Sequence, residues 1–190
     1  SGCVLALNLG EAVSGPRLDL TYTSGVVSQL HDHGFPLYNT ATKPAFVIND
    51  FTTSYEIANG ITSAIDTDSL GNPIANNRFY NLVVWGVISE EEKDCKLFFN
   101  LPNGSYSTEA DALADADVTA NYTIPNEYVG TGFLLSKITI QRTTTEVMYV
   151  SGGVTDLRGS VPGAVGGGGG GSSGGGGAVD CRPTARRRVG

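Results

Sequence analysis

Two histidines spaced two residues apart form the most suggestive ligand pair in the chain. On a single β-strand, His31 and His33 would point to the same face, where two imidazoles can hold a metal ion together with a third ligand. The neighbouring spacing offers no third ligand. The pattern therefore favours polar packing or a subunit contact, and His31 and His33 are metal candidates that the sequence does not complete.

Aspartates are the next residues with chemical potential. Glycoside hydrolysis needs two facing carboxyl groups, which Asp19, Asp32 or Asp50 could supply, but no spacing selects a pair. Asp66 and Asp68 suggest a calcium loop, yet the glycine and final glutamate of an EF-hand are missing, so a solvated loop is expected.

Motifs for nucleotide or acyl chemistry are also missing. The sequence has no P-loop, no Rossmann fingerprint and no GxSxG elbow. Three cysteines, Cys3, Cys95 and Cys181, show no zinc-type spacing, and the sequence leaves open whether Cys3 and Cys181 pair. We expect a protein that is not an enzyme and that uses no cofactor.

Composition narrows the class of partner. The 190 residues carry a net charge of −7, with 40% hydrophobic and 16% charged residues, and four of the arginines lie near the C-terminus. An acidic body argues against nucleic-acid binding, which needs a basic patch. No stretch approaches the roughly 20 apolar residues of a membrane helix, so no membrane insertion is expected.

The run from Phe79 to Ile88 predicts a central strand. It is rich in aromatic and β-branched residues and nearly continuous in apolar character, as expected for a strand buried on both faces. Trp85, the one tryptophan, is predicted to anchor the core. Gly86 removes a side chain where a neighbouring backbone or ring comes close.

Further strands are predicted on both sides of this run. They are Val4 to Leu9, Leu18 to Thr23, a strand from Val26 running into the residues up to Pro36, Ala45 to Ile48, Cys95 to Leu101, Phe133 to Ile140 and Glu146 to Val150, with 154–159 closing the sheet. One helix is predicted over Ser107 to Asp117, capped by Ser107. Its Asp111 and Asp115 share a face, and a solvated face explains them more simply than a cation site.

Both ends of the chain are candidate assembly segments. The first strand is either an ordinary edge strand or an arm that pairs with another subunit, since exposed terminal strands are templates for β-addition. Beyond Pro162 the chain is glycine-rich, so residues 1–160 are expected to form the domain and 161–190 a tail. The candidate assembly residues are Val4, Leu5, Leu7, Leu9, Gly166, Gly170 and Gly174.

Several segments, taken in order, resemble tail-fibre-like structural proteins of phage and environmental sequences, with self-assembled environmental fibrils as a related group. They are Gln29 to Pro36, Leu82 to Val87, Asn100 to Tyr106, Ile124-Pro125 with Gly130 to Leu134, and Thr155 to Gly159 before the glycine-rich stretch. The resemblance implies a β-rich building block of an extracellular or virion appendage, with no catalytic residues to carry over. Arg186 to Arg188 depart from its pattern.

We therefore expect an all-β protein, a jelly-roll-like β-sandwich with one short helix and a glycine-rich C-terminal tail. The expected function is that of a structural subunit, extracellular or virion-associated, which self-assembles with copies of itself into a helical fibre by exchanging terminal segments. The alternative is a module that binds cell-surface glycans through exposed aromatics such as Tyr38, Tyr55 and Tyr106. Asn103 and Asn121 each begin an N-glycosylation pattern.

Overall fold

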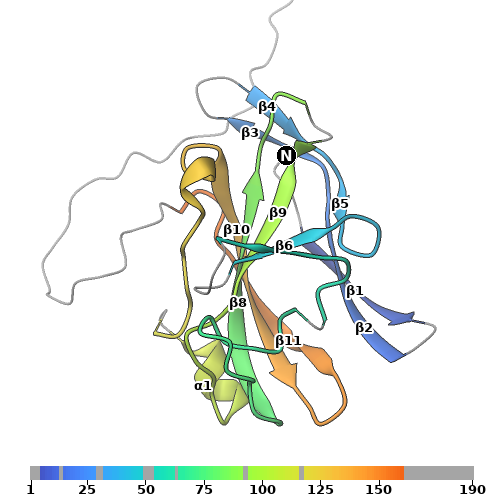
Figure 1. Cartoon of the computed structure of the whole chain (residues 1–190), viewed down its shortest axis with the longest axis vertical. Coiled ribbons are helices and arrows are strands. Elements are labelled where there is room, and N and C mark those ends of the chain that lie inside the picture. Colours follow the sequence, from blue (N-terminus) through green and yellow to red (C-terminus); the bar gives the residue numbers. More distant parts are fainter. Residues whose placement is uncertain are drawn as a thin grey trace, which may run out of the picture.

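A mixed six-stranded sheet forms the centre of the computed structural model, which describes residues 5–12, 15–28, 32–48, 54–62, 64–91, 94–115 and 118–160 (Figure 1). The strand order is β11-β10-β8-β9-β6-β7, and all neighbours are antiparallel except β6 and β9. The bounds are Ala45–Ile48 (β6), Glu56–Ala58 (β7), Arg78–Val87 (β8), Lys96–Asn100 (β9), Gly132–Arg142 (β10) and Val147–Asp156 (β11).

Strand β8 is an inner strand of this sheet, as predicted. Every residue from Tyr80 to Val87 is buried, and alternate side chains enter two separate apolar clusters. Leu82 and Val84 face one cluster, whereas Val83 and Trp85 face the other. The nearly continuous apolar run therefore reflects a strand that is covered on both faces.

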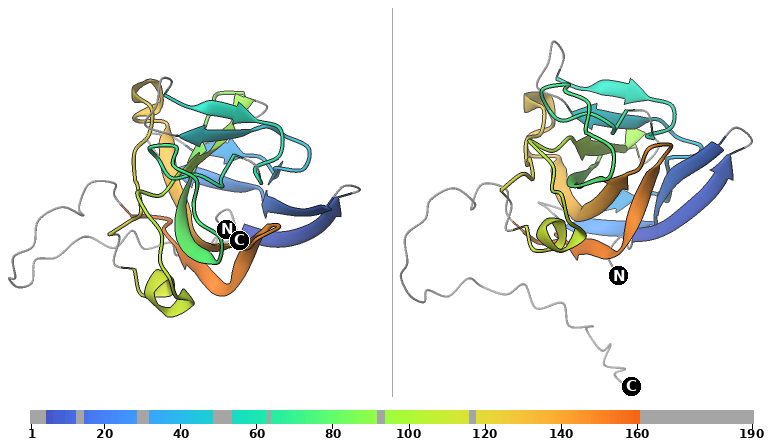
Figure 2. Two further views of the ribbon diagram at one scale, coloured as in Figure 1. Left: turned by 60° about the horizontal axis from the view of Figure 1, so that its bottom comes forward. Right: turned by 90° about the horizontal axis from the view of Figure 1, so that it is seen from below.

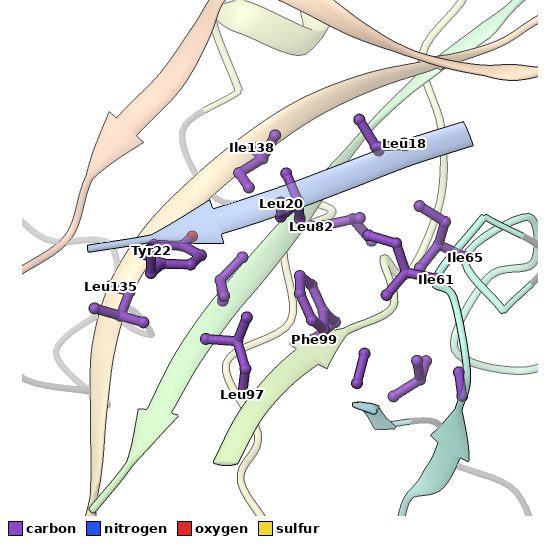
Figure 3. Packing of buried hydrophobic residues seen from close by; sticks show 14 of the residues in the cluster. Leu18, Leu20, Tyr22, Ile61, Ile65, Leu82, Leu97, Phe99, Leu135 and Ile138 are labelled. Carbon is purple, nitrogen blue, oxygen red and sulfur yellow. The ribbon is translucent and has the colours of Figure 1, made fainter. Parts of the chain in front are cut away.

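A smaller sheet covers the first face. It consists of Leu5–Ala12 (β1), Gly15–Tyr22 (β2) and Tyr38–Asn39 (β5) in the order β1-β2-β5. Leu18, Leu20 and Tyr22 are buried and alternate with half-buried residues, which confirms the predicted strand from Leu18. Figure 3 shows these side chains of β2 lying across those of β8, β9 and β10.

The segment from Val26 to Pro36 differs from its prediction as one strand. Gly25–Ser28 (β3) and Asp32–Phe35 (β4) pair antiparallel, with Ser28 opposite Asp32, so the segment forms a hairpin. Phe35 of this hairpin is fully buried in the first cluster and packs edge-on against Phe133 at 5.4 Å between ring centroids. The chain reverses here because the hairpin brings Phe35 onto the large sheet, where its ring is buried.

The second face is covered by the chain between β9 and β10. This segment carries Glu109–Leu113 (α1) and the short 3-10 helix Asn126–Tyr128 (η2), and it packs Ala120, Tyr122 and Ile124 against the cluster around Trp85. Figure 2 shows it running along the side of the large sheet. A long loop without strands thus takes the place of a covering layer.

Helix α1 is shorter than predicted, and a different residue caps it. Thr108 adopts an extended conformation and its Oγ1 accepts the backbone N–H of Asp111 at 3.2 Å, which places the start one residue after the predicted Ser107 cap. The helix ends at Leu113. The side chain of Asp115 already accepts hydrogen bonds from Asn81 of the sheet and from the Val118 N–H of the following loop, so the backbone leaves the helix before it.

Strands β10 and β11 form the predicted hairpin. The first half of the predicted closing segment, Val154 to Asp156, continues the strand predicted over Glu146 to Val150, because β11 runs on through a register shift opposite Ile138 and Ile140. Gly152, with φ of 77°, takes up this irregularity. Residues 157–159 lie beyond the strand. The predicted tail, residues 161–190, lies outside the described residues.

Candidate functional site

Strand β1 occupies an open edge of the small sheet. All eight of its residues are in register with β2, from Leu5 opposite Tyr22 to Ala12 opposite Gly15. Among the strands that the structure describes, none pairs with the other side of β1. An edge of this kind presents backbone N–H and C=O groups to which another strand can add.

Two threonines reveal the direction of the backbone groups in β2. Leu20 donates its N–H to Thr40 Oγ1 at 2.9 Å and accepts the Thr40 N–H at 3.0 Å. Leu18 donates its N–H to Thr62 Oγ1 at 3.3 Å. In an antiparallel ladder successive residues direct these groups to opposite sides. The backbone N–H and C=O groups of Leu18 and Leu20 therefore point away from β1, and those of Asp19 point toward it.

The same alternation orients β1. Asn8 lies opposite Asp19 and Ala6 lies opposite Thr21, so Ala6 and Asn8 direct their backbone groups toward β2. Leu5, Leu7 and Leu9 then direct theirs away from the sheet. Three of the candidate assembly residues thus supply the open edge, whereas Val4, Gly166, Gly170 and Gly174 lie outside the described residues.

The other described edges are protected in ways that β1 is not. Strands β3, β4, β5 and β7 have two to four residues each, and β11 carries the register shift at Gly152. On β2, Thr40 and Thr62 take the hydrogen bonds that a neighbouring strand would make. Strand β1 contains no proline or lysine, and Glu11 is its one charged residue. Short length, bulges and charge are the usual protections of an edge, so β1 is the least protected one.

Those of the predicted metal and acid candidates that the structure describes do not gather into a site. His33 is half-buried on β4, and His31 and Asp50 lie outside the described residues. Asp32 accepts the Ser28 hydroxyl at 2.5 Å, and Asp68 caps a turn by accepting the N–H groups of Leu70 and Asn72. Within the described ranges, no three histidine, cysteine, aspartate or glutamate side chains are grouped to hold a metal ion.

A second candidate is a pocket beside an aromatic cluster on the second face of the large sheet. The cluster joins Phe46, Tyr55, Phe98 and Tyr128 through ring centroid distances of 5.0 to 6.1 Å. The pocket is an open hollow of about 230 Å³, lined by Ile48, Ser54, Thr123, Ile124, Pro125, Asn126 and Glu127. Its mixture of apolar and hydrogen-bonding groups suits a small polar ligand.

A lysine adds positive charge to this cluster. Lys96 Nζ lies 5.6 Å from the ring centroid of Tyr128 and 6.0 Å from that of Phe46, within range of cation–π attraction. Burial, the hydrogen bond with Tyr55 and the nearby Glu127 raise the pKa of Tyr128 to about 12, so its hydroxyl stays protonated at neutral pH. Sequence reasoning missed this grouping because its members come from four separate segments.

The three tyrosines predicted to bind glycans differ in their exposure. Tyr38 is 2% exposed and donates its hydroxyl to Pro44 O, so the prediction of Tyr38 as an exposed aromatic is wrong. Its position on β5 directs it into the core. Tyr106 is half-buried and hydrogen-bonds Thr119 and Asp115, and Tyr55 is half-buried in the aromatic cluster. Tyr55 is therefore the member of the trio beside the pocket.

Of the remaining candidates, Asn121 adjoins the pocket through Thr123, and neither Asn103 nor Cys95 lines it. Asn103 is exposed and accepts the Ser69 hydroxyl at 2.8 Å, and half-buried Asn121 accepts the Thr123 hydroxyl at 2.5 Å. Cys95 is buried with its Sγ 3.8 Å from Gly34 O, whereas Cys3 and Cys181 lie outside the described residues. No helix in the described part of the chain is long and apolar enough to cross a membrane.

Comparison of the chain with protein-family models, with curated proteins and with solved structures found no match.

Proposed function

We propose that the chain is a structural subunit that self-assembles, through its terminal segments, into an extracellular or virion-associated helical fibre. The observation that carries this proposal is the open edge of β1, where Leu5, Leu7 and Leu9 direct their backbone groups away from the sheet. A protein that protects its other described edges and leaves an eight-residue edge regular has a ready place for strand addition.

Our inference about the architecture is that the two β layers form a β-sandwich of jelly-roll type. This inference is supported by the side chains of β2, which are buried against the large sheet. In a sandwich of this type, the strands of the two layers are expected to run nearly parallel to one another. The 161–190 segment, with Gly166, Gly170 and Gly174, is the second candidate contact and would be ordered by neighbours in the fibre.

Electron microscopy of the purified full-length protein at neutral pH tests the function directly. Regular filaments are expected. Deletion of residues 1–10 and deletion of everything after Pro162 are each expected to abolish filaments while leaving a folded monomer, which the emission of Trp85 reports. Intact filaments from both truncations, or discrete monomers from the full chain, would contradict the proposal.

Glycan recognition is the second candidate function, and the pocket beside Tyr55 and Tyr128 favours it. Sugars bind where an aromatic or apolar wall lies next to hydrogen-bonding groups, as Pro125, Asn126 and Glu127 provide here. A glycan array is expected to give hits that Glu127→Ala weakens. Glu109→Ala, which changes an exposed glutamate on α1, is the matched control and should bind normally. An array without hits rejects this candidate.

A further inference from the structure

We infer that β1 pairs antiparallel with β1 of a second copy across a two-fold axis at Leu7. This inference rests on the proposed function, because it names the partner that the open edge takes. It follows from which residues of β1 direct their backbone groups outward and from the sequence of that strand.

When a second copy of β1 lies antiparallel to the first, the outward leucines of one strand face outward leucines of the other. A two-fold axis at Leu7 places Leu7 opposite Leu7 of the second copy and Leu5 opposite its Leu9. All these residues direct N–H and C=O toward the partner strand, so each facing pair exchanges two backbone hydrogen bonds. The sequence Leu-Ala-Leu-Asn-Leu is nearly palindromic about this centre, with Ala6 facing Asn8 of the partner.

Other registers lose this match. Moving the axis to Asn8 sets Leu5 opposite Glu11, which places an apolar side chain against the single charge of the strand. Moving it to Ala6 leaves Leu9 facing residue 3 and keeps two leucine pairs instead of three. The axis at Leu7 therefore gives the largest number of leucine pairs and keeps the carboxylate of Glu11 away from the leucines of the partner.

A second copy of β1 also suits this edge better than the glycine-rich tail. Side chains across a strand pair provide its stabilisation, and the stretch around Gly166, Gly170 and Gly174 has almost none to offer to the leucine positions. A two-fold contact closes on itself, so a fibre built on it uses the β1 dimer as its repeating unit and needs one further contact to grow.

Cysteine cross-linking at the proposed axis tests the register. In a background with Cys3→Ser and Cys181→Ser, Leu7→Cys is expected to give disulfide-linked dimers under mild oxidation. Directly opposite residues in such a pair have Cα atoms about 5.5 Å apart, within disulfide range. Asn8→Cys is the matched control, because Asn8 faces Ala6 of the partner and its own copy lies diagonally away, so this variant should stay monomeric on denaturing gels.

The backbone prediction has its own test. Leu7→Pro removes an outward N–H, whereas Asn8→Pro removes one that points to β2, so the first should block pairing between copies and the second should loosen the β1–β2 ladder of its own chain. Leu7→Ala, which keeps the N–H, controls for loss of the leucine side chain and should retain more dimer than Leu7→Pro. Trp85 emission checks folding in each variant. Equal dimerisation of Leu7→Pro and Leu7→Ala would overturn the inference.

Cross-linking and microscopy together separate the two proposals. Filaments with Leu7→Cys dimers support both. Filaments without these dimers, or with equal cross-linking of Asn8→Cys, overturn the pairing at Leu7 and leave the structural function standing. Dimers without filaments support the pairing and overturn the fibre. Monomers throughout overturn both.

Discussion

The ring of Phe133 lies against Gly86, its direct cross-strand neighbour in the β10–β8 ladder. A Cβ atom at position 86 would be 2.3 Å from Phe133 Cζ, closer than any real contact. The same ring packs edge-on against Phe35 of β4. Gly86 therefore provides the space in which an aromatic residue joins the β3–β4 hairpin to the large sheet.

Replacement of Gly86 by alanine should destabilise the protein by about 1–3 kcal/mol, because overpacking forces the Phe133 ring out of its place. Chemical denaturation followed by Trp85 emission measures the change. Gly104→Ala is the matched control, since a Cβ there meets Thr119 Cγ2 at an ordinary 3.5 Å. Equal effects of the two substitutions would show that the ring of Phe133 has room to move.

Asp115 links the long loop to the second face of the large sheet through hydrogen bonds. It is 7% exposed, which corrects the expectation of a solvated carboxylate, and it accepts hydrogen bonds from Asn81 at 3.0 Å and from the Val118 N–H at 2.7 Å. Asp115→Asn should cost about 2 kcal/mol or more, because it places an amide donor against buried donors. Exposed Asp111, changed to asparagine, should cost no more than about 0.5 kcal/mol.

The loss of unfolding free energy at acidic pH should depend on Asp115. Burial raises the pKa of this carboxyl, but hydrogen bonds from Asn81, Tyr106, Val118 and Thr119 outweigh burial and leave it below its usual value. Its contribution is therefore fully present above the unfolded-state pKa, near 3.8, and is lost as pH falls through the lower folded-state pKa. Unfolding free energy measured between pH 2 and pH 6 should fall less steeply in Asp115→Asn, and parallel curves would contradict this role.

Asn100 links the tryptophan to the same loop. Its Oδ1 accepts the Trp85 Nε1–H at 2.7 Å and its Nδ2 donates to Thr123 O at 2.7 Å. Asn100→Ala leaves both partners without this bond and should destabilise the protein by about 2–4 kcal/mol, the sum of two buried groups at roughly 1–2 kcal/mol each. Denaturation with a red shift of Trp85 emission measures it. A change under about 0.5 kcal/mol would mean that water replaces the amide.

Buried tyrosines should make the protein sensitive to alkali. Burial raises the pKa of Tyr38, a hydrogen bond with the Leu97 backbone lowers it in part, and the resulting value is about 12. Burial also raises the pKa values of Tyr22 and Tyr80. Stability from a raised pKa is fully present below the unfolded-state value of 10 and is lost as pH rises through the folded-state value.

Tyr38→Phe is the variant that isolates one of these groups. It should lower stability at pH 7 by about 1 kcal/mol, through loss of the hydrogen bond to Pro44 O, and should reduce the further loss between pH 10 and pH 12. Urea denaturation across this range measures both effects. An unchanged slope in the variant would show that Tyr38 does not contribute to the alkaline loss.

Local patterns were sufficient for much of the fold. The apolar run around Trp85 predicted an inner strand, and the alternation from Leu18 predicted a half-buried one, because burial on one or two faces of a sheet imposes its own period on the chain. Gly86 was predicted to lie where a neighbouring backbone or ring comes close, and the ring of Phe133 is the neighbour found there. The hairpin at β3 and β4 was missed, because its reversal depends on the docking of Phe35 and not on local period.

The sequence by itself determined the longer strands, β2, β8, β10 and the first part of β11 among them, the position of the helix to within a few residues and the self-complementary leucines of β1. The tertiary structure decided which edge of the small sheet is open, that Asp115 and Tyr38 are buried, and that Tyr55 and Lys96 both lie against the ring of Tyr128. The physical reason is the range of the interactions. A strand follows from neighbours along the chain, whereas an open edge or a pocket depends on contacts between residues far apart in the sequence.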